Sequence, residues 1–566
     1  MVDHDGVQRD SATTRPQPRL RVSPEVRLSL RAAFCISVPL LLGLIIHQRL
    51  YAIVAGIGAL WAISQDGLDA WHVRGPRLLW VVAAGGIGVA LGSTFIDHHG
   101  ATWESILFVG VIALVAGFAE ASNHATAGAY LLIGSVLGVG LEFKGQEWQS
   151  SLAIVIGALW VYVVAALMDR VFHLETQRVY LARAFDALAL TVEALGTATF
   201  YRVRAQAVAT LDRARDVVGA IHLESSSTEE RSLYQCLIVA LRCGEAISYF
   251  EGKDIQVGPP VAEALRDVAR TLRSDGATSA VSTLAAVRDR FTSVPALTTV
   301  VAHAFDVTLT VAGPHAVTRY PTKGLLPVKE RLRFALILAV AVSAGLGVSH
   351  ALDGPHGFWL PLAVAFILRP DVGPVIQRAL ARTVGTTVGV GIAALVAWTG
   401  NTILELIILS CVMAAIQPWA QRRSHTLSVM TFTPIVFVFL GLLGADKGLF
   451  GVRILDTAIG AAIVLVLDVL LWTTAPSLRP VQQLADARAA SERYGAESAI
   501  DNPIRRHQLR RLALRAVATA RNSVVSARSE PRLLRRLDPT SVAQLNDIER
   551  SIDAHTVALL ENDQGQ

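Results

Sequence analysis

The stretch FILRPDVGPVIQRALARTVGTTVGVG, residues 366–391, places three arginines and an aspartate between two apolar runs. WLPLAVAF precedes the charged residues and TVGTTVGVGIAALVAW follows them. The chain of 566 residues is 52% hydrophobic and only 17% charged, with a mean hydropathy of +0.46. In such a chain, this alternation is typical of a charged loop between membrane helices. The composition therefore predicts an all-α, polytopic membrane protein.

Other features of the composition exclude several functions. The net charge is only +5, and the arginines lie in tails and short loops, which argues against nucleic-acid binding. The four cysteines show neither a disulfide framework nor metal-ligand spacing. Neither a P-loop nor an HExxH motif or catalytic Ser-His-Asp set occurs, so we expect no enzyme activity, ATP-driven pumping or cofactor. The polar N-terminal tail lacks a small-residue cleavage site, so we expect it to be retained in the cytoplasm.

Hydropathy divides the chain into five regions. The predicted domains are an N-terminal tail at 1–28, a membrane block at 29–172, a soluble helical domain at 173–328, a second membrane block at 329–475 and a C-terminal helical domain at 476–566. The first block has apolar segments near 30–47, 50–65, 77–96, 103–119, 124–142 and 150–172. The second block has them near 332–350, 356–368, 379–398, 402–417, 425–443 and 452–475. The second segment of each block is short for a bilayer, which indicates a tilted, broken or re-entrant helix.

The two blocks resemble each other in sequence. LRAAFCISVPLLLGLIIH matches LRFALILAVAVSAGLGVSH, and QDGLDAWHVRGPR aligns with PDVGPVIQRALAR. This alignment places Asp66 on Asp371 and Arg77 on Arg382, so each copy has an acid and an arginine eleven residues later. Each block has six spans, an even number, so both blocks begin on the same side of the membrane and the repeat is parallel, as in many transporters. The distribution of arginine between alternate loops predicts that both termini and both helical domains are cytoplasmic.

The second block also resembles a known family. The aromatic residue entering a short apolar segment, then RPD, then RALARTVGTTVGVGIAAL, resembles the fusaric acid resistance protein-like family, also described as aromatic acid exporters. Arg382, Gly385, Thr386 and Gly389 match its R-x-x-G-T-x-x-G helix start, whereas the first block departs from this pattern. The resemblance implies an inner-membrane secondary transporter that exports aromatic or other organic acid anions with the proton gradient.

The charged loop supplies the candidate substrate-binding residues. These are Arg369, Asp371, Arg378 and Arg382 in the second block, with Asp66 and Arg77 in the first. Guanidinium groups bind carboxylates through two parallel hydrogen bonds, so a cytoplasmic vestibule for an organic anion is one interpretation. The other is that the arginines only anchor helix ends at the cytoplasmic face.

Acids and glycines in the apolar segments suggest further roles. Asp468, Glu405 and Glu104 are candidates for proton coupling, because a carboxylate within hydrocarbon costs about 2.5–3.5 kcal/mol on insertion scales and usually has a function. A protonated helix–helix hydrogen bond explains Asp468 equally well. The pairs Gly385 with Gly389 and Gly88 with Gly92 form GxxxG motifs, which predict close helix packing.

The sequence is compatible with three different functions. The first is a secondary exporter of organic anions, with the short segments near Trp61 and Trp359 helping to form the site. The second is an organic-anion channel, because the helical block also resembles plant aluminium-activated malate transporters and arginines can line an anion pore. The third is a membrane scaffold that does not transport. The expected partners are the lipid bilayer and a small organic anion; a homodimer and a separate periplasmic adaptor both stay open.

Overall fold

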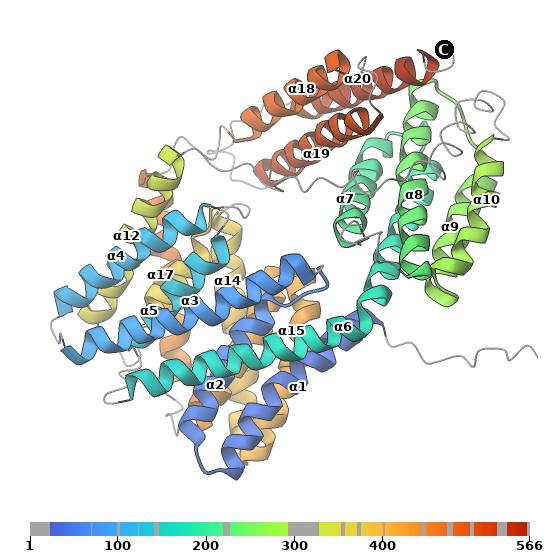
Figure 1. Ribbon diagram of the computed structural model, residues 1–566. Coiled ribbons are helices and arrows are strands. Elements are labelled where there is room, and N and C mark those ends of the chain that lie inside the picture. The colour runs from blue at the N-terminus through green and yellow to red at the C-terminus, as the bar shows by residue number, and fades with distance from the viewer. Residues whose placement is uncertain are drawn as a thin grey trace, which may run out of the picture.

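A computed structural model describes residues 23–69, 71–98, 102–122, 124–140, 146–218, 227–292, 328–352, 357–370, 375–399, 402–442, 448–471, 479–497, 503–528 and 540–562. These residues form an all-α protein, as the composition predicted. Figure 1 shows two groups of helices, joined by the long helix α6. We call the group that contains α1–α5 and α12–α17 the membrane bundle, and the group that contains α7–α10 and α18–α20 the helical body.

Each predicted apolar segment coincides with one helix of the membrane bundle. The first block forms α1 (Pro24–Ile45), α2 (Arg49–Gln65), α3 (Trp71–His98), α4 (Thr102–Glu120), α5 (Ala125–Gly140) and α6 (Glu147–Glu193). The second block forms α12 (Val328–Ala351), α13 (Trp359–Ile367), α14 (Val375–Thr399), α15 (Ile403–Arg423), α16 (His425–Leu442) and α17 (Leu449–Leu471).

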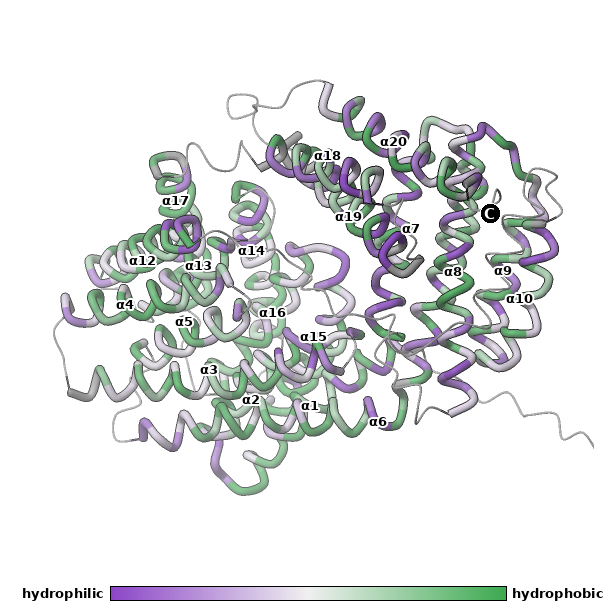
Figure 2. Tube along the Cα trace, turned by 45° about the horizontal axis from the view of Figure 1, so that its top comes forward, coloured by the Kyte–Doolittle hydropathy of each residue, from purple (hydrophilic) through white to green (hydrophobic). Residues whose placement is uncertain are grey.

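Nine helices in the described part of the chain are long and apolar enough to cross a membrane, and α2 and α5 are shorter apolar helices. Most of the exposed large apolar side chains belong to this bundle, which is the green group in Figure 2. Trp103, Trp148 and Trp398 are exposed near the bundle end that lies away from the helical body. Tryptophan is enriched at membrane interfaces. The chain is therefore a multi-pass membrane protein.

The second segment of each block is short, as the sequence indicated. Helix α13 has nine residues, which corresponds to about 14 Å and cannot cross a hydrocarbon core of about 30 Å. Its C-cap, Leu368, is extended, with ψ of 103°, and Pro370 lies two residues later. Helix α2 ends in the same way at Asp66, which is also extended. Both helices are buried along most of their length, so protein rather than lipid surrounds them.

Helices pack in matching pairs within and between the blocks. In the first block α3 packs on α5 and α6, and α2 packs on α6; in the second, α14 packs on α16 and α17, and α13 packs on α17. Between the blocks, α4 packs on α12 and α1 packs on α15. One continuous apolar core includes residues of both blocks. The two blocks therefore form a single bundle.

Glycines allow the closest backbone contacts in this bundle. A Cβ atom added to Gly157 on α6 would lie 1.8 Å from the carbonyl oxygen of Ala55 on α2. A Cβ atom added to Gly58 on α2 would lie 2.1 Å from the carbonyl oxygen of Ile154 on α6. No side chain fits at these positions, so α2 and α6 are in contact through their backbones.

Helix α6 has 47 residues and a length of about 70 Å, and it continues from the membrane bundle into the helical body. The change in composition near residue 173, predicted as a domain boundary, therefore lies inside one continuous helix. The helical body adds α7 (Phe200–Val218), α8 (Thr228–Gly252), α9 (Pro259–Ser274), α10 (Ala277–Thr292), α18 (Arg479–Glu497), α19 (Pro503–Arg528) and α20 (Ser541–Asn562).

The middle and C-terminal helices of the body pack together, although the sequence predicted two separate domains. Arg204 on α7 contacts Asp553 on α20 at 2.5 Å and Glu549 at 3.3 Å, and all three side chains are buried. Burial alone would lower the pKa of Arg204, but the two carboxylates raise it above its usual value. Arg511 on α19 likewise contacts Asp212 on α7 at 2.5 Å. The segments that follow α6 and α17 thus meet in one body.

Candidate functional site

Asp66 belongs to a buried ion network at the bundle end that faces the helical body. Its carboxylate lies 2.6 Å from Arg31 on α1 and 3.4 Å from Arg74 on α3. Arg74 also contacts Asp169 on α6 at 3.0 Å and donates a hydrogen bond to the Gly67 carbonyl oxygen. Arg77, which the sequence placed with Asp66, pairs instead with the more exposed Asp69. In this structure Asp66 connects three helices and has its cationic partners within the protein.

The predicted residues of the second block lie at the same end. Arg369, just after α13, pairs with Glu120 at the end of α4, so this ion pair joins the two blocks. The Glu120 side chain is only 3% exposed. Arg378 donates a hydrogen bond of 3.2 Å to the Arg369 carbonyl oxygen. Asp371 lies outside the described residues.

Arg382 has a different environment from these neighbours. Its guanidinium lies over the ring of Phe366, 4.3 Å from the centroid, and the residue is 5% exposed. Among the described residues, the charges that act on it most come from Arg453 and Arg369, which are both positive. Such a group is a candidate for binding an anion, because a buried guanidinium is stable only when a negative group or dipole compensates its charge.

A cavity of about 370 Å³ lies between the two blocks. Its walls come from α2, α5, α13, α16 and the start of α17, and they include the aromatic side chains of Trp61, Trp359, Phe366, Phe432 and Phe439. This volume is that of a site for a small molecule. The cavity therefore lies beside the two short helices that the sequence associated with a site.

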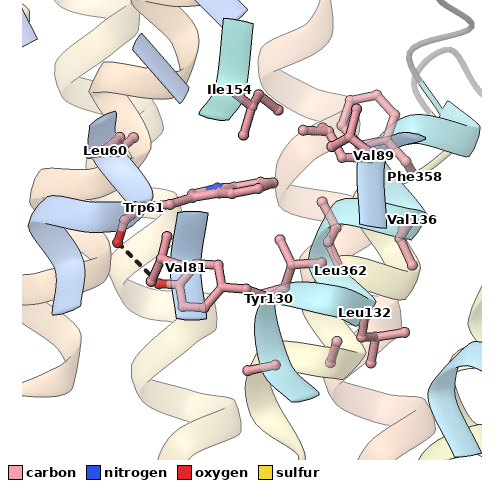
Figure 3. Packing of buried hydrophobic residues seen from close by; sticks show 14 of the residues in the cluster. Leu60, Trp61, Val81, Val89, Tyr130, Leu132, Val136, Ile154, Phe358 and Leu362 are labelled. Carbon is pink, nitrogen blue, oxygen red and sulfur yellow. Dashed lines mark hydrogen bonds between the residues drawn. The ribbon is translucent and has the colours of Figure 1, made fainter. Parts of the chain in front are cut away.

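The Trp61 side of this cavity is fixed by a hydrogen-bonded cluster. Figure 3 shows the Trp61 ring beside Tyr130 of α5, with a centroid distance of 5.7 Å. The Tyr130 hydroxyl donates to the Trp61 carbonyl oxygen at 3.2 Å and lies 2.6 Å from the Ser64 hydroxyl. Gln421 at the end of α15 donates to the Ser64 carbonyl oxygen at 2.7 Å. Polar groups of both blocks thus form a hydrogen-bonded cluster beside the Trp61 side of the cavity.

Arg453 is the charged residue that lines the cavity, at the opposite end. It lies in the second turn of α17, over the Trp359 ring at 5.0 Å, and is 6% exposed. Its Nε and Nη1 atoms have no hydrogen-bond partner among the described residues. A buried guanidinium with unused donors can bind a carboxylate, and the surrounding aromatic rings can bind an aromatic group.

Asp456 lies one turn further along α17 and is 7% exposed. The charged group that acts on it is Arg453, but within the described residues no ion pair joins the two side chains. Sequence reasoning missed both residues as site candidates. A signal was present, since Arg453 is one of few arginines on the predicted outer side, where arginine is disfavoured.

The predicted proton-coupling acids are distributed over both ends of the bundle. Asp468 is half-buried in the last turn of α17, on the side of the helical body, whereas Asp456 lies nearer the middle of that helix. Glu405 forms a capping box with Thr402 at the start of α15, in which Thr402 Oγ1 accepts from the Glu405 N–H at 3.3 Å. Glu104 lies in the first turn of α4. None of these three acids lines the cavity, within the residues that the structure describes.

The predicted glycine pairs lie at close helix contacts. Gly88 and Gly92 face α5, where added Cβ atoms would lie 2.5 and 2.2 Å from backbone oxygens. Gly385 and Gly389 face α16, with the nearest atoms at 2.7 and 2.8 Å. Both motifs therefore allow the third helix of a block to pack closely on the fifth. The four glycines position helices near the cavity but do not line it.

Comparison with known proteins gives one family match, which lies in the membrane bundle, and partial matches to individual proteins. Residues 335–467 match the family described as fusaric acid resistance protein-like. Inner membrane protein YccS of Escherichia coli is 24% identical over 137 residues, which are 24% of this chain and 19% of that protein. Uncharacterized protein ORF2 of Neisseria gonorrhoeae is 29% identical over 143 residues, 25% of this chain and 34% of that protein. Uncharacterized protein slr1298 of Synechocystis is 36% identical over 59 residues, 10% of this chain and 8% of that protein.

No solved structure matches the chain. The matched residues 335–467 extend from α12 to α17 and include Phe366, Arg382, Arg453 and Asp456. The chain covers about a third or less of the length of each of these relatives. Residues 335–467 thus match the family model, which confirms over this part of the chain the resemblance to the fusaric acid resistance protein-like family seen in the sequence.

Proposed function

We propose that this protein is an inner-membrane secondary transporter that binds aromatic or other organic acid anions in the cavity between its two blocks. The observation that supports this most is Arg453, a buried guanidinium with two unused nitrogen donors in a cavity whose other lining residues, apart from Gln146, are aromatic or aliphatic. The carboxylate of a bound anion would accept hydrogen bonds from these donors. Its ring would replace water against Trp359 and the neighbouring aromatic side chains.

A two-fold repeat of the blocks fits this function. The matching helix pairs support it, and so do two equivalent contacts at the end that faces the helical body. There, the end of α4 contacts the residue after α13 through Glu120 and Arg369, and the end of α15 contacts the end of α2 through Gln421 and Ser64. Transport sites commonly lie between related halves of a membrane protein.

The helical body is proposed to be cytoplasmic, together with the arginine-rich end of the bundle. The positive-inside rule supports this orientation. The cavity is then closed from the cytoplasm by the Glu120–Arg369 pair and the Ser64–Tyr130 cluster. Movement of the blocks against each other would open this end and admit the anion near Arg382. Export driven by the proton gradient is the form of this function that the sequence predicted.

Flux measurements in proteoliposomes test the proposal. The full-length protein should move benzoate, a simple aromatic carboxylate, faster than protein-free liposomes, and Arg453→Met should abolish the difference. Proton-driven export requires that removal of the pH gradient at constant voltage stops accumulation. An anion current that does not need the gradient would favour the channel. Absence of both flux and current would refute transport and leave the scaffold.

A further inference from the structure

Asp456 is a buried carboxylate that the proposed transport step does not yet use. It lies three residues after Arg453, so the two side chains lie on the same face of α17. Both residues are more than nine-tenths buried. In the described part of the chain, the carboxylate forms no ion pair with Arg453 or with any other cation, although the positive charge of Arg453 acts on it.

Among the described residues, Arg453 is the charged group that acts on Asp456, although Arg382 on α14 lies close enough for the charges of Arg382 and Arg453 to interact. Helices α12, α13 and α14 pack against α17. On α14 the cations are Arg378 and Arg382, near the helix start that faces the helical body. On α12, Lys329, Glu330, Arg331 and Arg333 are at that same end, and His350 is at the opposite end, exposed, with Nδ1 bonded to the Leu346 carbonyl oxygen. Helix α13 has no charged residue.

Asp456 is not among the residues that line the cavity, but it lies one turn from Arg453, which does, so the charge balance of the site involves both side chains. When the cavity is empty and Asp456 is ionised, the Arg453 and Asp456 charges compensate each other. An anion bound by Arg453 would bring a second negative group next to Asp456 at one shared guanidinium, with Arg382 as the next cation, in a largely buried site. Like charges at such short range favour protonation of one carboxyl group. The Asp456 carboxylate can accept this proton in its buried position, because the protonated form carries no charge.

We propose that the cavity binds an organic anion and a proton together, the anion at Arg453 and the proton at Asp456. This inference rests on the proposed function, since it concerns the same site. By linkage, bound anion increases the proton affinity of Asp456, and bound proton increases the affinity for the anion by the same factor. The proton is then a partner of the anion in the cavity rather than its competitor. If the anion and the proton crossed the membrane together, an inward proton gradient would drive uptake of the anion, whereas proton-driven export by exchange would require the two to compete for the site.

Calorimetry of the purified full-length protein with benzoate tests this linkage. Titration in two buffers of different ionisation enthalpy gives the number of protons taken up per benzoate bound. Benzoate is fully ionised between about pH 6 and pH 8, so protons taken up belong to the protein. We expect the protein to take up protons when benzoate binds. We also expect the affinity for benzoate to rise on the order of 10-fold as the pH falls from about 8 to about 6. Neutral benzamide should cause no proton uptake.

Two variants distinguish Asp456 from Asp468, one of the acids that the sequence suggested for proton coupling. Asp456→Asn should still bind benzoate, but without proton uptake and without pH dependence. Asp468→Asn should bind benzoate with the same proton uptake and the same pH dependence as the parent protein. Benzoate binding without proton uptake, an affinity that falls with falling pH, or uptake that is lost only in Asp468→Asn would overturn the inference and leave the transporter proposal intact. Failure of the parent protein to bind benzoate at any pH would overturn the proposed function itself.

Discussion

Arg453→Met gives the most direct test of the cavity as an anion site, because affinity and stability should change in opposite directions. A hydrogen bond between charged groups contributes about 1.5–3 kcal/mol. Loss of the guanidinium should therefore weaken benzoate binding roughly 10- to 150-fold. In the ligand-free protein the same guanidinium is buried with two unpartnered donors, and each such group costs about 1–3 kcal/mol. Methionine removes this cost, and Asp456 can take up a proton once the Arg453 charge is gone, so the empty variant should be at least as stable as the parent.

Thermal unfolding with and without benzoate measures both quantities. Ligand that binds only the folded protein stabilises it by RT ln(1 + [L]/Kd), so the dependence of the melting temperature on benzoate concentration reports the affinity. Arg423→Met, at an exposed arginine at the end of α15, is the matched control and should change neither quantity. An Arg453→Met protein that binds benzoate normally would refute the reasoning. So would a ligand-free melting temperature several degrees lower, because removal of one partner of a structural ion pair costs about 3–5 kcal/mol.

Three further predictions concern the bundle and the helical body. Glu120→Gln removes the charge that pairs with Arg369, so hydrogen exchange in α13 should become faster; an unchanged rate would contradict the proposed closure. Gly157→Val should abolish recovery of folded protein in size-exclusion chromatography, whereas Gly391→Val, with open space around it, should not. Burial raises the pKa of Cys236 to about 12, so its thiol stays protonated at neutral pH and maleimide should label it only after unfolding, as mass spectrometry can show.

The sequence by itself determined the class of the protein and the position of its membrane helices. Hydropathy is a local property, because each span must bury its own backbone hydrogen bonds in lipid. Each of the twelve segments predicted from it therefore overlaps one helix, and the short second segment of each block could be identified from its length. The GxxxG pattern indicated close packing, because only small residues allow two helix backbones to meet.

Only the tertiary structure decided which side chains meet. Glu120 and Arg369 are 249 residues apart in sequence and form one ion pair, and Asp66 pairs with Arg31 and Arg74 rather than with Arg77. The cavity and the roles of Arg453 and Asp456 depend on contacts between blocks, which no periodic pattern within one helix records. Charge patterns report the side of the membrane on which a loop lies, whereas partners and burial are fixed by the packing of distant helices.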